Sequence, residues 1–225
     1  MLLQVTSFIL KYYMQHILYL LELVACITGF IFWNKIKGSF WKWFPFYLAI
    51  ICAVEITGDI LNYIEEYNFK NLMYNYFSIP LEFLFLYWLH YKYAAGEKRK
   101  RLVILCALVY LTSIVLDQVY FKDTNFYFNS FSYCIGNMAL LVVIISFFIQ
   151  FSTGHEIIHF NKSMIFWVSL GTLIFYLGSL PFYGLYNLLY KKYFEVFVFY
   201  SYIMYVCNWI MYSLFTVAFI WGKPK

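Results

Sequence analysis

The sequence predicts an all-α integral membrane protein, a bundle of about seven transmembrane helices. Of its 225 residues, 64% are apolar and only 12% are charged, whereas a soluble domain carries about 25% charged residues. The aromatic residues among them make up a quarter of the chain, a proportion that suits a bundle facing lipid. The apolar residues also fall into separate runs, each close to the roughly 20 residues that a helix needs to cross a bilayer.

The predicted spans follow one another with short connections. In chain order they are Tyr12–Trp33, Trp43–Ile64, Leu72–Tyr91, Leu102–Tyr120, Phe126–Phe148, Met164–Tyr183 and Phe194–Trp221. No stretch is left over for a soluble domain, a linker or a low-complexity tract. We therefore expect a single transmembrane helical domain over residues 1–225.

Orientation is predicted from Lys and Arg, which are enriched in cytoplasmic loops. Eleven lie on one side, namely Lys35, Lys37, Lys42, Lys92, Lys98, Arg99, Lys100, Arg101, Lys162, Lys223 and Lys225, and five on the other, namely Lys11, Lys70, Lys122, Lys191 and Lys192. Most Trp residues lie near the ends on the richer side, as in an interfacial belt. We expect the N-terminus outside and the C-terminus in the cytoplasm.

The charge and the cysteines exclude several classes of protein. The net charge of +5 lies mostly in predicted cytoplasmic loops, so it indicates topology and not nucleic-acid binding. The basic run Lys98–Arg101 makes anionic membrane lipids an expected partner. The N-terminus lacks a basic region and a cleavage site, so we expect no removable signal peptide. The five cysteines lie within spans without metal-ligand spacing, which favours apolar packing.

Polar residues inside the spans indicate where a functional site would lie. A carboxylate at a helix centre costs about 2.5–3.5 kcal/mol on insertion scales, so such a residue usually faces a protein interior or a water-filled cavity. Four acidic residues occupy such positions, accompanied by amides and a hydroxyl. The candidate ligand- or proton-binding residues are Glu22, Glu55, Asp59, Asn75, Ser78, Glu82, Asn137 and Asn208.

The second and third spans each carry a polar stripe on one face. Glu55 and Asp59 are four residues apart, and Asn75, Ser78 and Glu82 follow at intervals of three and four, which places each set on one helical face. The short connection makes the two helices antiparallel neighbours, with Glu55 level with Glu82. We expect these two carboxylates to form a pair that shares a proton.

Two interpretations of the polar stripes remain open. In the functional one, they line an outward-opening cavity for a ligand, an ion or a proton, with Pro80 and Pro181 kinking the helices beside it. In the structural one, they hydrogen-bond neighbouring helices, at about 0.6 kcal/mol each. The carboxylates favour the functional interpretation, because amides would hold helices together without the cost of a charge.

The segment His155-Glu156-Ile157-Ile158-His159 matches H-E-x-x-H, the zinc metalloprotease signature. His90 and Glu97 are candidate third ligands on the same side. However, the motif falls in a short connection, no later His follows it, and no soluble lobe is available to form a substrate cleft. Helix Phe194–Trp221 also lacks the lysine that a retinal Schiff base requires. We therefore expect no bound metal, no cofactor and no enzymatic activity.

Three stretches resemble a group of small uncharacterised seven-helix membrane proteins of Bacteroidota-type bacteria. They are Asn71-Leu-Met-Tyr-Asn-Tyr running to Glu82-Phe-Leu-Phe, Phe166-Trp167 with Gly171, and Asn208-Trp-Ile-Met-Tyr-Ser-Leu-Phe. Together they cover about a third of the chain. The resemblance implies a sensing role alongside signalling kinases, and it assigns no functional residues. The high content of Phe, Tyr, Ile, Lys and Asn suits an AT-rich bacterial genome.

The function expected from the sequence is that of a non-enzymatic, receptor-like protein of the bacterial inner membrane. It would bind a small ligand or protons from outside and pass a signal to a separate cytoplasmic or membrane partner. A proton- or cation-coupled transporter or channel, or an oligomeric membrane effector, is the alternative. The inner halves of the second and third spans are nearly all apolar, which favours a closed pocket over a pore.

Overall fold

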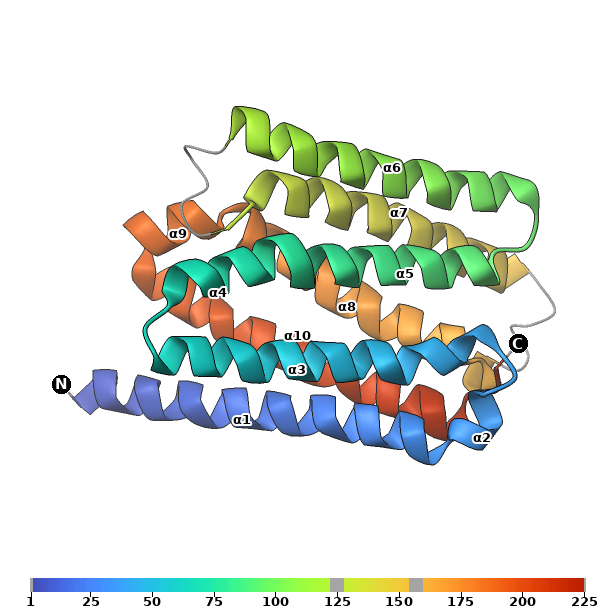
Figure 1. The fold of residues 1–225 in the computed structure, drawn as a ribbon, viewed down its shortest axis with the longest axis horizontal. Helices are drawn as coiled ribbons and strands as arrows, with labels where there is room; N and C mark the ends of the chain where they lie inside the picture. Colours follow the sequence, from blue (N-terminus) through green and yellow to red (C-terminus); the bar gives the residue numbers. More distant parts are fainter. Residues whose placement is uncertain (1, 122–127, 154–159, 225) are drawn as a thin grey trace. The chain divides into compact units, whose positions relative to one another are not determined.

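The computed structural model describes residues 2–121, 128–153 and 160–224, with side chains for 13–121, 128–152 and 160–224. This part of the chain is helical almost throughout (Figure 1). No strand forms within it, and one isolated bridge joins Ser163 to Lys223. The predicted all-α class is therefore confirmed. The helices are α1 (Leu2–Ile31), α2 (Trp33–Ile36), η1 (Phe40–Lys42), α3 (Trp43–Tyr63), α4 (Tyr67–Met73), η2 (Tyr74–Ser78), α5 (Ile79–Tyr93), α6 (Glu97–Tyr120), α7 (Ser130–Thr153), α8 (Met164–Gly184), α9 (Tyr186–Lys192) and α10 (Phe194–Trp221).

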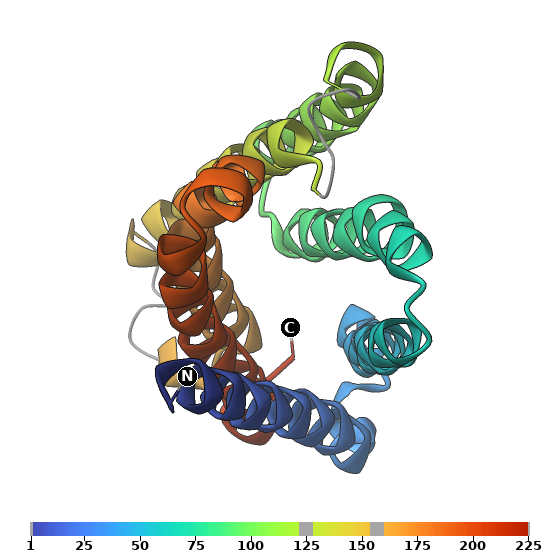
Figure 2. The same cartoon turned by 90° about the vertical axis from the view of Figure 1, so that its left-hand side faces the viewer.

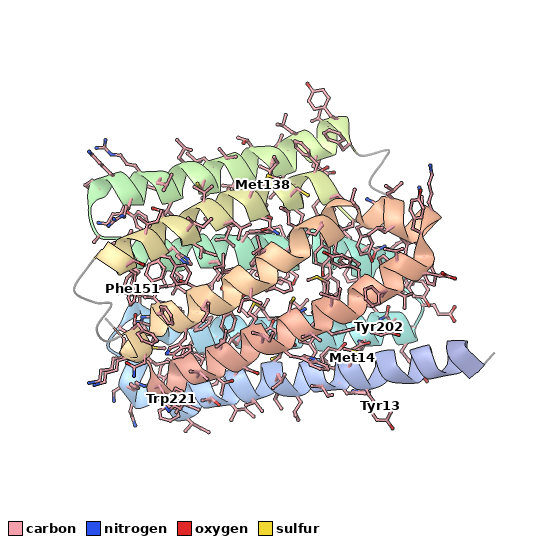
Figure 3. All side chains as sticks on the ribbon, turned by 180° about the vertical axis from the view of Figure 1, so that it is seen from behind. Tyr13, Met14, Met138, Phe151, Tyr202 and Trp221 are labelled. Carbon is pink, nitrogen blue, oxygen red and sulfur yellow. The ribbon has the colours of Figure 1, made fainter. Side chains whose placement is uncertain are left out.

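Among the described residues, six helical stretches are long and apolar enough to cross a membrane. They are Tyr13–Ile31, Phe40–Tyr63, Glu97–Tyr120, Ser130–Ser152, Met164–Gly184 and Phe194–Trp221. Large apolar side chains stand exposed on them, including Tyr13 at 62%, Met138 at 51% and Trp221 at 63% (Figure 3). Apolar exposure on this scale marks surfaces that lipid or protein covers. The chain is thus a multi-pass membrane protein.

The predicted third span, Leu72–Tyr91, differs from the others. It falls on the end of α4, the π-helical turn η2 and α5, which follow one another without a break. The 15 residues of α5 cover only about 22 Å at 1.5 Å per residue, too little for a hydrocarbon core of about 30 Å. A crossing here needs η2 and α4 as well, and the seventh span stays a prediction.

Pro80 explains the irregular turn in this segment. It stands in the first turn of α5, directly after η2, and a proline inside a helix cannot donate to the carbonyl four residues earlier. A π-helical turn is one way for a helix to absorb such a break. Gln118 of α6 donates to the Tyr76 hydroxyl of this turn. The predicted kink beside Glu82 is therefore a π-helical turn that lies before it in the chain.

The chain divides into two compact units. The first unit comprises Met1–Glu55, Asn161–Gly178 and Glu195–Lys225, and the second comprises Ile56–Phe160 and Ser179–Phe194. Helices α3 and α8 each contribute to both units.

In the first unit, α1, α3 and α10 meet at Gly29. A Cβ atom on Gly29 would lie 2.7 Å from Pro45 Cγ and 2.9 Å from Phe219 Cζ, so only glycine allows this approach. Phe44 packs its ring against Phe215 and Phe219, with centroids 5.1 and 5.3 Å away. An aromatic cluster thus joins the start of α3 to the end of α10.

Lys35 of α2 fixes the end of α10. Its ammonium group donates to the carbonyl oxygens of Phe219, at 2.8 Å, and Ile220, at 3.1 Å. The last carbonyls of a helix have no partner within the helix and carry partial negative charge. Burial, followed by the positive charge of Lys223, lowers the pKa of Lys35 below 10.5. The contact satisfies two carbonyls that the helix itself leaves open.

In the second unit, α6 runs antiparallel to both of its neighbours, α5 and α7 (Figure 1). Helices α6 and α7 remain adjacent in the rotated view (Figure 2). They approach closely at Gly136 of α7, where a Cβ atom would lie 2.4 Å from Cδ2 of Tyr110 on α6. Tyr87 of α5 donates its hydroxyl hydrogen to the Gly136 carbonyl oxygen at 2.8 Å. All three helices therefore meet around one glycine.

Candidate functional site

A buried hydrogen-bonded group lies between α7 and the end of α8 in the second unit. The Ser179 hydroxyl lies 2.9 Å from the Tyr133 hydroxyl, and Asn137 donates its side-chain amide to the same oxygen at 3.1 Å. Tyr133 and Asn137 are four residues apart on α7, so they share one face. Asn137 and Ser179 are fully buried and Tyr133 is 5% exposed. We call these three residues the Ser179 cluster.

Glu82 of α5 lies beside this cluster. Its charge acts electrostatically on the hydroxyl of Tyr133 and on that of Tyr110 in α6. The neighbouring Phe83 fixes the spacing, because its ring packs 4.7 Å from that of Tyr110 and 5.5 Å from that of Tyr133. A half-buried carboxylate, two tyrosines and the Ser179 cluster thus come together from four helices.

The second unit holds a further buried carboxylate that the sequence analysis missed. Asp117 of α6 is fully buried, and its Oδ2 atom accepts a hydrogen bond from the backbone N–H of Ser132 at 2.9 Å. Ser132 belongs to the first turn of α7, where N–H groups have no partner within the helix. Asp117 therefore caps a neighbouring helix. Its spacing from Tyr110 and Ser113, all buried on one face, was a signal available in the sequence.

Ser179 was also missed, although its helix carries a visible pattern. Ser169, Thr172, Tyr176 and Ser179 recur at intervals of three and four along α8, and none of them is more than 1% exposed. Hydroxyl groups within a span are weaker signals than acids and amides, because many bond to their own helix. Thr172 does so, donating to the Val168 carbonyl at 2.7 Å.

Three other predicted site residues lie in the same unit. The Asn75 side chain, in η2, accepts a hydrogen bond from the backbone N–H of Asn129 at 3.2 Å. Ser78, at the end of η2, is buried at 7% exposure. Asp59 on α3 is half-buried and follows Gly58, where a Cβ atom would lie 2.5 Å from the Tyr74 hydroxyl oxygen. Of these three residues, Asn75 joins η2 to the residue just before α7.

The remaining predicted residues, Glu22, Glu55 and Asn208, lie in the first unit. Glu22 of α1 is 3% exposed, and its charge acts on the Cys52 thiol of α3. Glu55 follows Cys52 by three residues on α3, so it stands on the same side of that helix. Asn208 donates to the Met204 carbonyl of its own helix at 3.1 Å, which is a local contact.

The predicted site residues are therefore divided between the units. Asp59, Asn75, Ser78, Glu82 and Asn137 belong to the second unit. The expected pairing of Glu55 with Glu82 joins one unit to the other, and it stays a prediction.

The zinc hypothesis falls largely outside the described residues, because His155, Glu156 and His159 are not among them. Within the described ranges, no group of three His, Cys, Asp or Glu side chains could hold a metal ion. His90, one proposed third ligand, points its Nδ1 atom at the Leu86 carbonyl oxygen at 2.8 Å. The zinc site stays a hypothesis about the motif.

The geometry around Ser179 suits the binding or relay of a proton. A hydroxyl–hydroxyl hydrogen bond can reverse its direction, because either oxygen can donate. The Tyr133–Ser179 pair has this property, and the Asn137 amide can only donate from its nitrogen. A change in the charge of Glu82 therefore acts on nearby hydroxyl groups that can rotate and reverse their hydrogen bonds.

Comparison with known proteins adds no further assignment: no family model, curated protein or solved structure matches this chain.

Proposed function

We propose that the protein is a non-enzymatic, receptor-like sensor of the bacterial inner membrane that responds to protons through Glu82 and the Ser179 cluster. It crosses the membrane seven times, with the N-terminus outside and the C-terminus in the cytoplasm. Segment Leu72–Tyr91 is the third crossing. The polar cluster then lies in the outer half of the second unit, on the side from which protons or a small ligand would arrive.

One observation carries this proposal: the Glu82 carboxylate acts on Tyr133, whose hydroxyl shares Ser179 with the Asn137 amide. A carboxylate inside a membrane protein is costly when charged. If the cluster served only to hold helices together, an amide at position 82 would do so without that cost. Retaining an acid next to reorientable hydroxyls supports a role for its protonation.

The response would work through hydrogen-bond direction. Protonation of Glu82 removes a negative charge near the Tyr110 and Tyr133 hydroxyls and adds an O–H donor. Tyr133 and Ser179 then exchange the roles of donor and acceptor, which alters the contact between α7 and α8. A signalling partner in the membrane or cytoplasm would detect this change through the basic segment Lys98–Arg101.

Infrared spectroscopy of the full chain in lipid vesicles tests the proposal. A protonated carboxyl group has its own C=O stretching band, and we expect a band that titrates with pH in the native protein. Glu82→Gln should remove the part of this band that belongs to Glu82. Glu195→Gln should leave the band unchanged, because Glu195 is an exposed acid in the first turn of α10. A native protein without this band, or a Glu82→Gln variant whose band is the same as that of the native protein, would contradict the proposal.

A flux measurement separates the sensor from a transporter. Vesicles containing the protein and a pH-sensitive dye should equilibrate protons no faster than empty vesicles, since the inner halves of the predicted second and third spans are nearly all apolar. Proton flux that depends on Glu82 would replace the sensor with a proton-coupled transporter.

A further inference from the structure

A pocket opens in the second unit where α5 ends and α6 begins. Its wall includes His90 and Tyr93 from α5, Arg99 from α6, and Ser146 and Gln150 from α7. It holds about 310 Å³ of unfilled space, its open mouth included. Little of this space is enclosed, so a bound group would occupy the mouth. This end of the unit is the predicted cytoplasmic end and lies apart from the Ser179 cluster.

Arg99 is the charged residue of the pocket, and it is half-buried. Among the residues that the structure describes, none forms an ion pair or a hydrogen bond with it. The nearby acid Glu97 contacts Lys100 at 3.5 Å and does not line the pocket, whose described lining contains no acid at all. Placing a guanidinium group in a half-buried position is costly unless an anion pairs with it, so an external anion would stabilise Arg99.

The other polar groups suit an anion as well. Ser146 and Gln150 are four residues apart on α7, so their hydroxyl and amide groups share the face that lines the pocket. Both can donate hydrogen bonds. His90 is 4% exposed, and its Nδ1 contact with the Leu86 carbonyl oxygen fixes the ring orientation. Two donors of α7 therefore stand in the same pocket as the guanidinium group of α6.

The surroundings favour a phosphate group. Arg99 is part of the basic run Lys98–Arg101, whose combined charge raises the local concentration of anions. The α5–α6 turn ends two apolar helices, which is the level at which lipid phosphates lie. The guanidinium fork matches two phosphate oxygens at once. We propose that this pocket binds a phosphate group through Arg99, with Ser146 and Gln150 as supporting donors.

Two sources could supply this chemistry, an anionic phospholipid or a soluble phosphate compound, and one titration distinguishes them. The full chain, purified in neutral detergent, is titrated with short-chain phosphatidylglycerol, with phosphatidylcholine and with inorganic phosphate, and binding is followed by phosphorus NMR. Binding of phosphatidylglycerol that inorganic phosphate does not displace assigns the pocket to a lipid headgroup. Binding of inorganic phosphate assigns it to a soluble ligand.

Arg99→Gln should lower the affinity for whichever species binds by about tenfold or more, because the substitution removes charge-assisted hydrogen bonds. Arg101→Gln is the matched control: it removes the same charge from the same helical turn, but Arg101 is exposed and does not line the pocket. Arg99→Lys keeps the charge and loses the fork, so an intermediate loss is expected. This variant also serves if Arg99→Gln does not fold.

Two results would overturn the proposal. Equal losses in the Arg99→Gln and Arg101→Gln variants would mean general attraction to a basic surface. The absence of binding by phosphatidylglycerol and by inorganic phosphate would mean that the pocket takes no phosphate group.

Discussion

Asp117 shows how much a single buried side chain can contribute to this fold. It is the acceptor for the Ser132 N–H at the start of α7, and loss of such a cap costs about 1–2 kcal/mol. Asp117→Ala should therefore lower the melting temperature by roughly 2–8 °C for a chain of this size. Asp117→Asn keeps an acceptor oxygen and should cost less. Thermal unfolding in detergent measures both.

Thr112→Ala is the control for this prediction. Thr112 is an exposed neighbour on α6 whose hydroxyl donates to the Val109 carbonyl of its own helix at 2.9 Å. Its removal should change the melting temperature little. If Asp117→Ala were as mild as Thr112→Ala, the capping role of Asp117 would be wrong.

Gly136 is a second position where one atom decides the packing. Gly136→Ala would put a methyl group within 2.4 Å of the Tyr110 ring, and overpacking of this kind costs about 1–3 kcal/mol. We expect lower thermal stability and a weaker Tyr87 contact with the residue 136 carbonyl. Gly38→Ala is the matched control, because nothing lies within 4 Å of its added methyl group. A stable Gly136→Ala variant would show that α6 and α7 can separate without cost.

At the scale of single residues, the sequence revealed acidic residues within the spans but not the side chain that caps a neighbouring helix. Glu22 and Glu82 could be identified because a carboxylate within an apolar run is conspicuous. Asp117 lies near the end of its run, where polar residues are ordinary. Its importance comes from a partner fifteen residues away on another helix, and helix pairing at that level of detail is not contained in periodicity alone.

Among the elements, the end of α10 offers the clearest test. Lys35→Gln removes the ammonium group from the Phe219 and Ile220 carbonyls, and a cation at such a helix end contributes about 0.3–1 kcal/mol, rising to about 2 where partly buried. Lys37→Gln is the control, because the Lys37 side chain is exposed and its ammonium group donates to the nearby Asn34 side chain at 3.1 Å. Melting temperatures in detergent should fall for Lys35→Gln and stay unchanged for Lys37→Gln. Equal values would contradict the capping role.

The pH dependence of this contact has a definite sign. Because the pKa of Lys35 lies below 10.5 in the folded protein, the unfolded chain binds more protons in the interval between the two values. The contribution of Lys35 to stability therefore rises as pH increases through that interval. Lys223→Gln removes a repelling charge and should raise the pKa of Lys35 in the folded protein. The pH range over which the stability changes should then become narrower.

Element boundaries followed from the sequence where apolar runs were long. The last predicted span, Phe194–Trp221, coincides with α10, and the sixth ends one residue before α8 does. The third predicted span did not foresee the π-helical turn Tyr74–Ser78. A proline indicates that the regular α-helical hydrogen bonding is interrupted. The sequence does not say whether the helix then bends, ends or forms a π-helical turn with one extra residue.

The arrangement of the whole molecule bears on the pairing of Glu55 with Glu82. If the two carboxylates share a proton, neither titrates alone and the pair shows two coupled steps. Glu55→Gln or Glu82→Gln should leave one simple titration and a normal fold, because the neutral amide resembles the protonated acid. Infrared titration of both single variants and the double variant measures this. Two independent titrations in the native protein would contradict the pairing.

Topology is the second prediction at this scale. With the N-terminus outside, Lys98→Cys should react with a membrane-impermeant thiol reagent only after cells are opened. Lys192→Cys, an exposed position on the predicted outer side, should react in intact cells. The reverse pattern would invert the orientation, and the phosphate pocket would then lie outside. The five native cysteines lie within predicted spans, so the unsubstituted chain supplies the background.

The sequence predicted membrane insertion and the all-α class, because composition and run length express the demands of the bilayer directly. It did not predict the two units of the chain. That division depends on which helices pack together, and close approaches within each unit, such as those at Gly29 and Gly136, are not revealed by periodicity.

The first unit joins the beginning of the chain to its end, and this has a consequence for synthesis. Gly29, Lys35 and Phe44 all have partners on α10, which leaves the ribosome after helices α1 to α9. The helices α5 to α7 of the second unit are complete long before that point, since domains generally fold in the order of translation. A chain that stops before α10 therefore exposes the Phe44 ring and leaves the Lys35 ammonium group without its carbonyls, so truncated products should be recognised and degraded.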